Sequence, residues 1–235
     1  FQSIDAVVAP LRPRELTDGE RVERKAPQVH TLFWSYFGLL IGVFVVTGLV
    51  FREERVDLQL LVADVALLAL TCIWGWIHRV SLKAQFGVFG FNRGAAYIGL
   101  AILVPLLAVD FGYHTWLESL MKDPPDDMLS DLREAGVGEL VLVISFCVMP
   151  AIIEEIAFRG LIQHWLQTAI RPHKAIIYAS FLFTVMHFSI LSFPYLFAVG
   201  ALLGWVKWKT RSLYPSMLIH FLHNYVVIEF FEKWR

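Results

Sequence analysis

The stretch from Met149 to Gln163, MPAIIEEIAFRGLIQ, places three ionisable residues inside an otherwise apolar run. Charged side chains within a membrane-spanning segment are costly unless they are paired or reached by water, so they are rare and mark functional sites. In a helix, Glu155 and Arg159 lie one turn apart on one face, where they can form an ion pair. Glu154 lies about 100° further round the helix and points elsewhere. The spacing therefore predicts one neutralised carboxylate and a second, Glu154, that faces a cavity as an acid or base.

Two further apolar stretches carry polar side chains at helical spacing. YASFLFTVMHFSI places Phe183 and His187 four residues apart, and SMLIHFLHNYVV does the same for His220 and Asn224. Each pair therefore shares one helix face. A single histidine or asparagine in such a helix more often hydrogen-bonds to a neighbouring helix than takes part in a reaction. A glutamate, two histidines and an asparagine on three separate helices exceed what packing requires, and we interpret them as a site.

Two kinds of hydrolytic chemistry fit this set. Glu154 and His187 could deprotonate a water molecule held between them, while His220 and Asn224 supply N–H donors for a developing oxyanion. Alternatively, Glu154, His187 and His220 form a two-histidine, one-carboxylate zinc site with an open position for water. Neither a serine nor a cysteine is spaced to act as a nucleophile with these histidines. The residues indicate a peptide hydrolase and leave both mechanisms open.

The composition indicates the kind of scaffold that holds these residues. Of the 235 residues, 57% are hydrophobic and 17% are charged, against about 45–50% and about 25% in a soluble domain. The mean hydropathy is +0.59. A net charge of −1 gives no reason to expect a nucleic acid as partner. We therefore expect an integral membrane protein, in which Cys72 and Cys147 are packing residues rather than a disulfide or a metal pair.

The apolar runs have about the length that a bilayer demands, near 20 residues each. They predict an all-α polytopic transmembrane bundle of about seven spans, with six to eight as the range. We place the spans at 31–51, 58–78, 95–113, 137–165, 175–191, 194–208 and 213–231. In the sixth, Gly200 and Gly204 have a spacing that lets helices approach closely.

The charge distribution predicts the domain organisation and the orientation. Residues 1–30 are rich in charge and proline and are predicted to form a charged cytoplasmic N-terminal tail, with residues 31–235 as the membrane-embedded domain. Lys and Arg in the segments on the N-terminal side outnumber those on the other side by about two to one. Because cytoplasmic segments carry the excess of basic residues, the N-terminus is predicted to be cytoplasmic.

With these motifs the chain resembles the CAAX protease and bacteriocin-processing family of intramembrane proteases. That family is marked by EExxxR, FxxxH and HxxxN on three successive membrane regions. The motifs stand here at Glu154–Arg159, Phe183–His187 and His220–Asn224. They lie in that order within a motif-bearing core at about 137–231.

The resemblance implies an endopeptidase similar to the type II CAAX prenyl endopeptidases, acting on a membrane-anchored or lipophilic protein or peptide. In this family Glu154 would activate the water, with His187 as its partner. His220 and Asn224 would form the oxyanion site. The family has been argued to act both with and without a metal, so no cofactor is expected on the glutamate mechanism and zinc is the alternative.

The resemblance also implies a supporting role for Glu155, Arg159 and Phe183, which would hold the helices and the site together. It places the chain in the membrane, and we expect this to be the bacterial inner membrane. Besides the substrate, the expected partners are the lipid bilayer and a membrane protein.

A non-catalytic membrane scaffold or bacteriocin-immunity protein of the same fold is the alternative function. A transporter that uses Glu154 and the histidines as a proton relay is a third.

Overall fold

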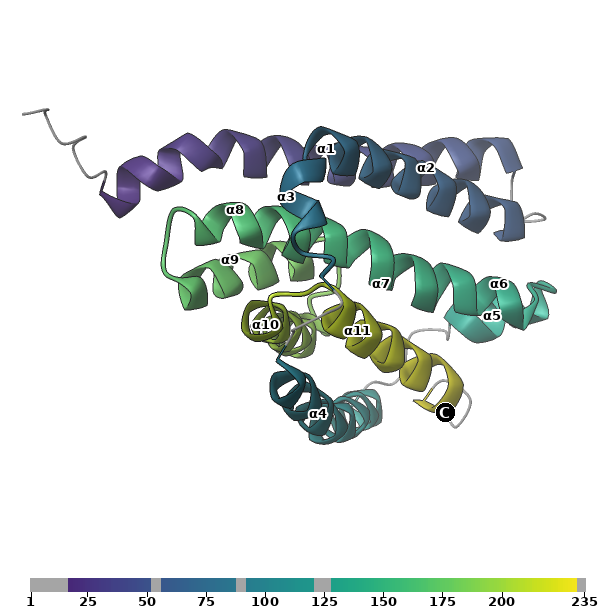
Figure 1. The fold of residues 1–235 in the computed structure, drawn as a ribbon. Coiled ribbons are helices and arrows are strands. Elements are labelled where there is room, and N and C mark those ends of the chain that lie inside the picture. The colour runs from purple at the N-terminus through teal and green to yellow at the C-terminus, as the bar shows by residue number, and fades with distance from the viewer. Residues whose placement is uncertain (1–16, 52–55, 88–91, 121–127, 232–235) are drawn as a thin grey trace, which may run out of the picture.

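The computed structural model describes residues 17–51, 56–87, 92–120 and 128–231, and every regular element among them is a helix (Figure 1). The long helices are α1 (Asp18–Phe51), α2 (Val56–Ile77), α4 (Arg93–Ser119), α9 (Pro172–Val185), α10 (Phe193–Thr210) and α11 (Tyr214–Val226). One further long helix comprises α6 (Glu139–Val143), η3 (Ile144–Val148), α7 (Met149–Glu154), η4 (Glu155–Gln163) and α8 (His164–Gln167). The short elements are α3 (Arg79–Lys83), α5 (Met128–Glu134) and the π-helix η5 (Val227–Phe231).

The all-α class is confirmed, whereas the predicted count of seven spans is not. Four helices are long and apolar enough to cross a membrane, at Glu23–Val50, Val56–Ile77, Arg93–Ser119 and Glu139–Gln167. The remaining three predicted spans are also helical but are not among these four: α9 has 14 residues, α10 has 18, and α11 has 13 and continues directly into η5. Of these, α9 falls short of the about 17–25 residues of a spanning helix.

Helix α1 begins at a capping box rather than at the first apolar residue. The Thr17 hydroxyl accepts the N–H of Glu20 at 3.3 Å, and the Glu20 carboxylate accepts the N–H of Thr17 at 2.8 Å. This reciprocal pair satisfies two N–H groups that a helix start leaves free, and it holds the pKa of Glu20 below its usual value. Residues 18–30 of the predicted tail are therefore helical and continuous with the first apolar segment. Residues 1–16 lie outside the described part.

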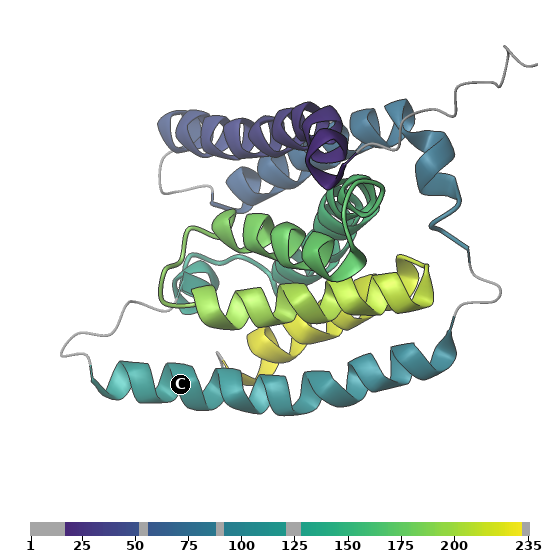
Figure 2. The same ribbon diagram turned by 90° about the vertical axis from the view of Figure 1, so that its left-hand side faces the viewer.

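The long helix through α7 and η4 lies at the centre of the bundle. The α1–α2 pair covers one side of it, α9 and α10 pack against η4, and α11 packs against α7 and η3. Helices α4 and α10 are seen nearly end-on in Figure 1 and from the side in Figure 2, so they cross the α1–α2 pair at a large angle. The central helix therefore contacts elements from both ends of the chain.

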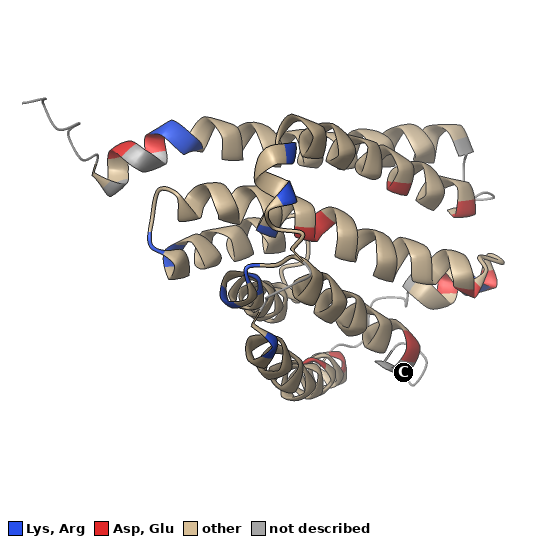
Figure 3. Cartoon of the chain, in the orientation of Figure 1, with Lys and Arg blue, Asp and Glu red and all other residues tan. Residues whose placement is uncertain are grey.

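Basic and acidic residues gather at opposite ends of the helices (Figure 3). Lys and Arg lie in α3, at the start of α4 and in the last turn of α10. Asp and Glu lie at the starts of α2 and α6, and in η5. The first turns of α1, Asp64 within α2, Arg133 of α5 and the charged residues of the central helix depart from this pattern. The described helices therefore share one basic end and one acidic end.

Candidate active site

The helix that carries both glutamates changes from α to π geometry between them. Helix α7 ends at Glu154 and η4 begins at Glu155; π segments are rare and occur frequently at functional sites. Gly160 lies within η4, and a Cβ there would come within 2.8 Å of Leu82 Cδ2. The Gln85 side chain donates to the Gly160 carbonyl at 2.9 Å. The absence of a side chain at Gly160 thus lets the segment after α3 pack directly on η4.

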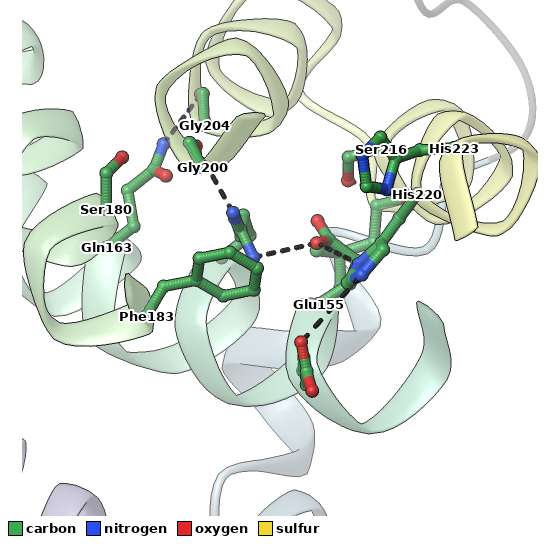
Figure 4. A network of polar contacts seen from close by, with 12 residues as sticks. Glu155, Gln163, Ser180, Phe183, Gly200, Gly204, Ser216, His220 and His223 are labelled. Atoms are coloured by element: carbon green, nitrogen blue, oxygen red, sulfur yellow. Dashed lines mark hydrogen bonds and ion pairs between the residues drawn. The ribbon is translucent and has the colours of Figure 1, made fainter. Parts of the chain in front are cut away.

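Glu155 is completely buried and has two charged or polar partners (Figure 4). Its Oε1 lies 2.8 Å from Arg159 Nη1, one helical turn away, and 3.0 Å from His220 Nδ1 on α11. The ion pair follows from the i, i+4 spacing in the sequence. The bond to His220 joins residues far apart in the chain and ties α11 to η4.

Arg159 is held by the neighbouring helices as well as by Glu155. Its Nη2 donates to the Gly200 carbonyl on α10 at 3.2 Å, and its guanidinium carbon lies 4.3 Å from the centre of the Phe183 ring. A Cβ on Gly200 would lie 3.2 Å from both Phe183 and Ser180, so α10 approaches α9 closely, as the glycine spacing predicted. One turn further along η4, Gln163 donates to the Gly204 carbonyl at 2.9 Å.

His187 and His220 each use one ring nitrogen to hold the ring in place. His187 Nδ1 lies 2.8 Å from the Phe183 carbonyl, and His220 Nδ1 lies 3.0 Å from the Glu155 carboxylate. Both partners only accept hydrogen bonds, so each Nδ1 must carry its proton. In the neutral rings, each Nε2 is then an acceptor with a free lone pair.

These two nitrogens face the same atom of Glu154. Its Oε2 lies 3.9 Å from His187 Nε2 and 3.8 Å from His220 Nε2, which is too long for a direct hydrogen bond. Oε2 is buried and has no hydrogen-bond partner among the described residues. Three acceptors, two on the helices α7 and α11 and one in the turn after α9, therefore face one another, and such a set requires a donor such as a proton or a bridging water.

A small pocket of about 100 Å³ opens onto this point. This volume is enough for a few water molecules, each of which occupies about 30 Å³ in the liquid. Besides Glu154 and His187, its walls include Tyr36 and Leu40 of α1 and Leu67 of α2. No motif in the sequence marks these three residues, because they belong to helices that precede the motif-bearing core.

Asn224 makes hydrogen bonds that the sequence does not predict. Its Nδ2 donates to the Phe146 carbonyl at 2.8 Å, and its Oδ1 accepts from His223 Nδ1 at 2.8 Å. Phe146 lies in the π segment η3 of the central helix, so this bond ties α11 to that helix. One N–H of the Asn224 amide remains for other partners. His223 continues this chain, with its Nε2 2.6 Å from the Tyr195 hydroxyl.

Among the described residues, no group of three His, Cys, Asp or Glu side chains meets the geometry of a metal site. The predicted zinc ligands Glu154, His187 and His220 do converge, with 3.8–3.9 Å between Glu154 Oε2 and the two Nε2 atoms.

The comparisons with known proteins identify the part of the chain that carries this geometry. Residues 136–226 match the family model described as type II CAAX prenyl endopeptidase Rce1-like. These residues are an Rce1-like domain. The family resemblance drawn from the three motifs is thereby confirmed, and the domain implies a protease. No curated protein and no solved structure matches the chain.

The Rce1-like domain begins just before α6 and ends at the last residue of α11. It contains all three motifs and both π segments of the central helix. Helices α1, α2 and α4 lie outside it, although the first two supply a wall of the Glu154 pocket. Together with the four apolar helices, the domain identifies the chain as an integral membrane protein.

Proposed function

We propose that the chain is an intramembrane endopeptidase that hydrolyses a peptide bond of a membrane-anchored or lipophilic protein or peptide. The observation that carries this proposal is the convergence of His187 Nε2 and His220 Nε2 on Glu154 Oε2, beside a small pocket that Glu154 and His187 line. A water molecule held there would donate one hydrogen to Glu154 and the other to His187, which is the arrangement that activates water as a nucleophile. The Rce1-like domain supports the same class of reaction.

In the proposed reaction, Glu154 takes a proton from water while the water oxygen attacks the substrate carbonyl carbon. His187 accepts the second water hydrogen at Nε2 and so orients the attacking lone pair. When the tetrahedral intermediate collapses, the C–N bond breaks and the proton on Glu154 passes to the leaving nitrogen. The products are a carboxylic acid and an amine, and Glu154 returns to its ionised form.

The negative charge that develops on the carbonyl oxygen needs N–H donors. His220 can supply one if its Nε2 is protonated, since the Glu155 carboxylate at its Nδ1 would stabilise the resulting cation. The free N–H of Asn224 is proposed as the second donor. Glu155, Arg159 and Phe183 act as positioning residues, because they fix the rings of His220 and His187 rather than contact the substrate.

Substitution of Asn224 by alanine separates its two proposed roles. Losing the part-buried hydrogen bond to the Phe146 carbonyl is expected to lower the free energy of unfolding by about 0.5–1.5 kcal/mol. Losing an oxyanion donor is expected to lower kcat by about 10²–10³-fold. Thermal unfolding and turnover of the purified variant measure the two effects. A loss of stability with normal kcat would leave Asn224 a purely structural role.

A zinc ion held by Glu154, His187 and His220 is the alternative proposal for the same site.

In the membrane, the basic end of the bundle would face the cytoplasm and the acidic end the opposite side, since Lys and Arg are retained on the cytoplasmic side. The N-terminus would then be cytoplasmic, and a bacterial inner membrane is the proposed location. A membrane protein partner is also proposed, because an intramembrane site depends on delivery of its substrate.

The proposal is tested in cells that produce the protein, by mass spectrometry of membrane and released proteins with wild type, Glu154→Ala and His187→Ala. We expect peptides whose new C-termini occur with wild type alone. Elemental analysis of the purified proteins is done in parallel. Stoichiometric zinc that is lost in both variants would support the metal alternative.

The same experiment addresses the scaffold or immunity function. If no cleavage differs between wild type and the two variants, and both variants retain the biological effect of the protein, the peptidase proposal is wrong. The convergence of His187 and His220 on Glu154 favours the peptidase, because a scaffold does not require it.

A further inference from the structure

A second cavity lies on the other side of the helix that carries Glu154. It is a groove of about 540 Å³ between α2, α3 and the α7–η4 helix, lined by apolar groups from Leu68 on α2 to Phe86 after α3. Ile152 and Ile156 form its wall on the central helix, whereas Ile153 and Ala157 face the Glu154 pocket. The groove shares no lining residue with that pocket. Its size lies within the range of about 300–1,000 Å³ that is typical of small-molecule sites.

Two cations line one part of this apolar groove. Arg79 and Lys83 lie one turn apart on α3, and both are exposed. Within the described part of the chain, neither side chain forms an ion pair. The Arg79 guanidinium lies 4.9 Å from the Trp76 ring and donates to the Trp76 carbonyl at 3.1 Å. These contacts fix the guanidinium beside the groove and leave most of its N–H donors free.

The surroundings place these cations where a membrane surface is expected. Trp76 is 71% exposed, and exposed tryptophans favour the level of the lipid head groups. The α2 helix ends one residue later, at Ile77, and α3 follows at the basic end of the bundle (Figure 3). The apolar walls, formed by the spanning helix α2 and the central helix, continue from this point toward the hydrocarbon region.

We propose that this groove binds one anionic phospholipid, with an acyl chain along the apolar walls and the phosphate between Arg79 and Lys83. The two features of the site require two features of the ligand. The two cations select a negative head group, while the largely apolar walls suit an acyl chain. An anionic amphiphile of the bilayer satisfies both. The site does not depend on the proposed peptidase reaction.

Two variants test the two halves of the site. Arg79→Gln combined with Lys83→Gln removes the cations and keeps polar side chains of similar length. Gly75→Leu fills the apolar part, since a Cβ at Gly75 has its nearest neighbour, Leu82 Cδ1, at 3.7 Å and fits without a backbone shift. The matched control is Arg171→Gln combined with Lys174→Gln, which removes two exposed cations at the start of α9, away from the groove.

The full chain is purified in mixed micelles with phosphatidylglycerol or phosphatidylcholine of identical acyl chains, and the retained lipids are counted by native mass spectrometry. For wild type and the control we expect at least about tenfold stronger retention of phosphatidylglycerol. We expect the Arg79/Lys83 variant to lose that preference and Gly75→Leu to lose both lipids.

Three results would overturn the proposal. The first is equal retention of the two lipids by wild type, which would mean a groove filled by any lipid or detergent. The second is an unchanged preference in the Arg79/Lys83 variant, or an equal loss in the control. The third is the retention of a peptide or protein in place of lipid.

Discussion

Substitution of Glu154 by glutamine is expected to lower the rate of peptide hydrolysis by about 10²–10⁴-fold, the contribution typical of a general base. The amide has the shape of the carboxylate but cannot take a proton from water at neutral pH. Its N–H group would also donate to His187 or His220 Nε2, across the 3.8–3.9 Å gaps of the wild type, and so occupy the place of the water. The measurement is turnover of the purified variant on the substrate found by mass spectrometry.

The stability of this variant is expected to be unchanged or slightly increased. In the wild type, a carboxylate oxygen and two nitrogen lone pairs face one another, and a donor in that position relieves their repulsion. A matched control is Glu139→Gln on the same long helix, where the carboxylate is 53% exposed and pairs with Arg133 at 2.9 Å. The control should keep full activity. Full turnover by Glu154→Gln would rule out the glutamate as the base.

Substitution of Glu155 by glutamine is expected to act on stability as well as on activity. It leaves the buried guanidinium of Arg159 without a counter-charge at this position, with the neutral amide oxygen, the Gly200 carbonyl and the Phe183 ring in place. Removing one member of a buried ion pair typically costs about 3–5 kcal/mol, because the other charge remains desolvated. The same change weakens the hold on His220 Nδ1. Thermal unfolding in detergent and turnover of the surviving folded protein measure the two losses.

The double variant Glu155→Met, Arg159→Met distinguishes the two causes. Replacing a buried ion pair by apolar side chains of similar volume is often neutral for stability, so the double variant should be more stable than either single variant. Activity should not return, since His220 still lacks its carboxylate partner. Recovery of both properties would show that the pair serves packing alone. A double-mutant cycle gives the coupling energy between the two residues.

The membrane class and the central ion pair could be predicted because both depend on local order along the chain. The lengths of the apolar runs predict helices, and all seven predicted segments are helical. The spacing of Glu155 and Arg159 fixes their relative position through helix geometry, whatever the rest of the bundle does. The Phe183–His187 contact, whose ring centres lie 4.6 Å apart, was also expected from the four-residue spacing, although His187 lies two residues beyond the end of α9. The three motifs also sufficed to identify the family of residues 136–226.

The helix boundaries were predicted less well. The start of α1 is set by the capping box at Thr17, which is a polar signal outside the apolar run. The end of α9 at Val185 falls before the predicted limit at 191, and the segment up to Phe193 turns back toward α10. A hydropathy profile detects neither feature. It averages the composition of a window of residues and does not register the hydrogen bonds at the ends of a helix.

Only the tertiary structure decided how the polar groups share their partners. His220 contacts Glu155 across 65 residues of sequence, and Asn224 donates to Phe146 across 78. Both contacts depend on how α11 crosses the central helix, and the periodicity of one helix contains no information about its crossing angle with another. For the same reason, the sequence did not show that Tyr36 and Leu67 line the pocket of Glu154. The sequence thus determined which side chains carry the chemistry, and the packing of the helices decided which atoms face one another.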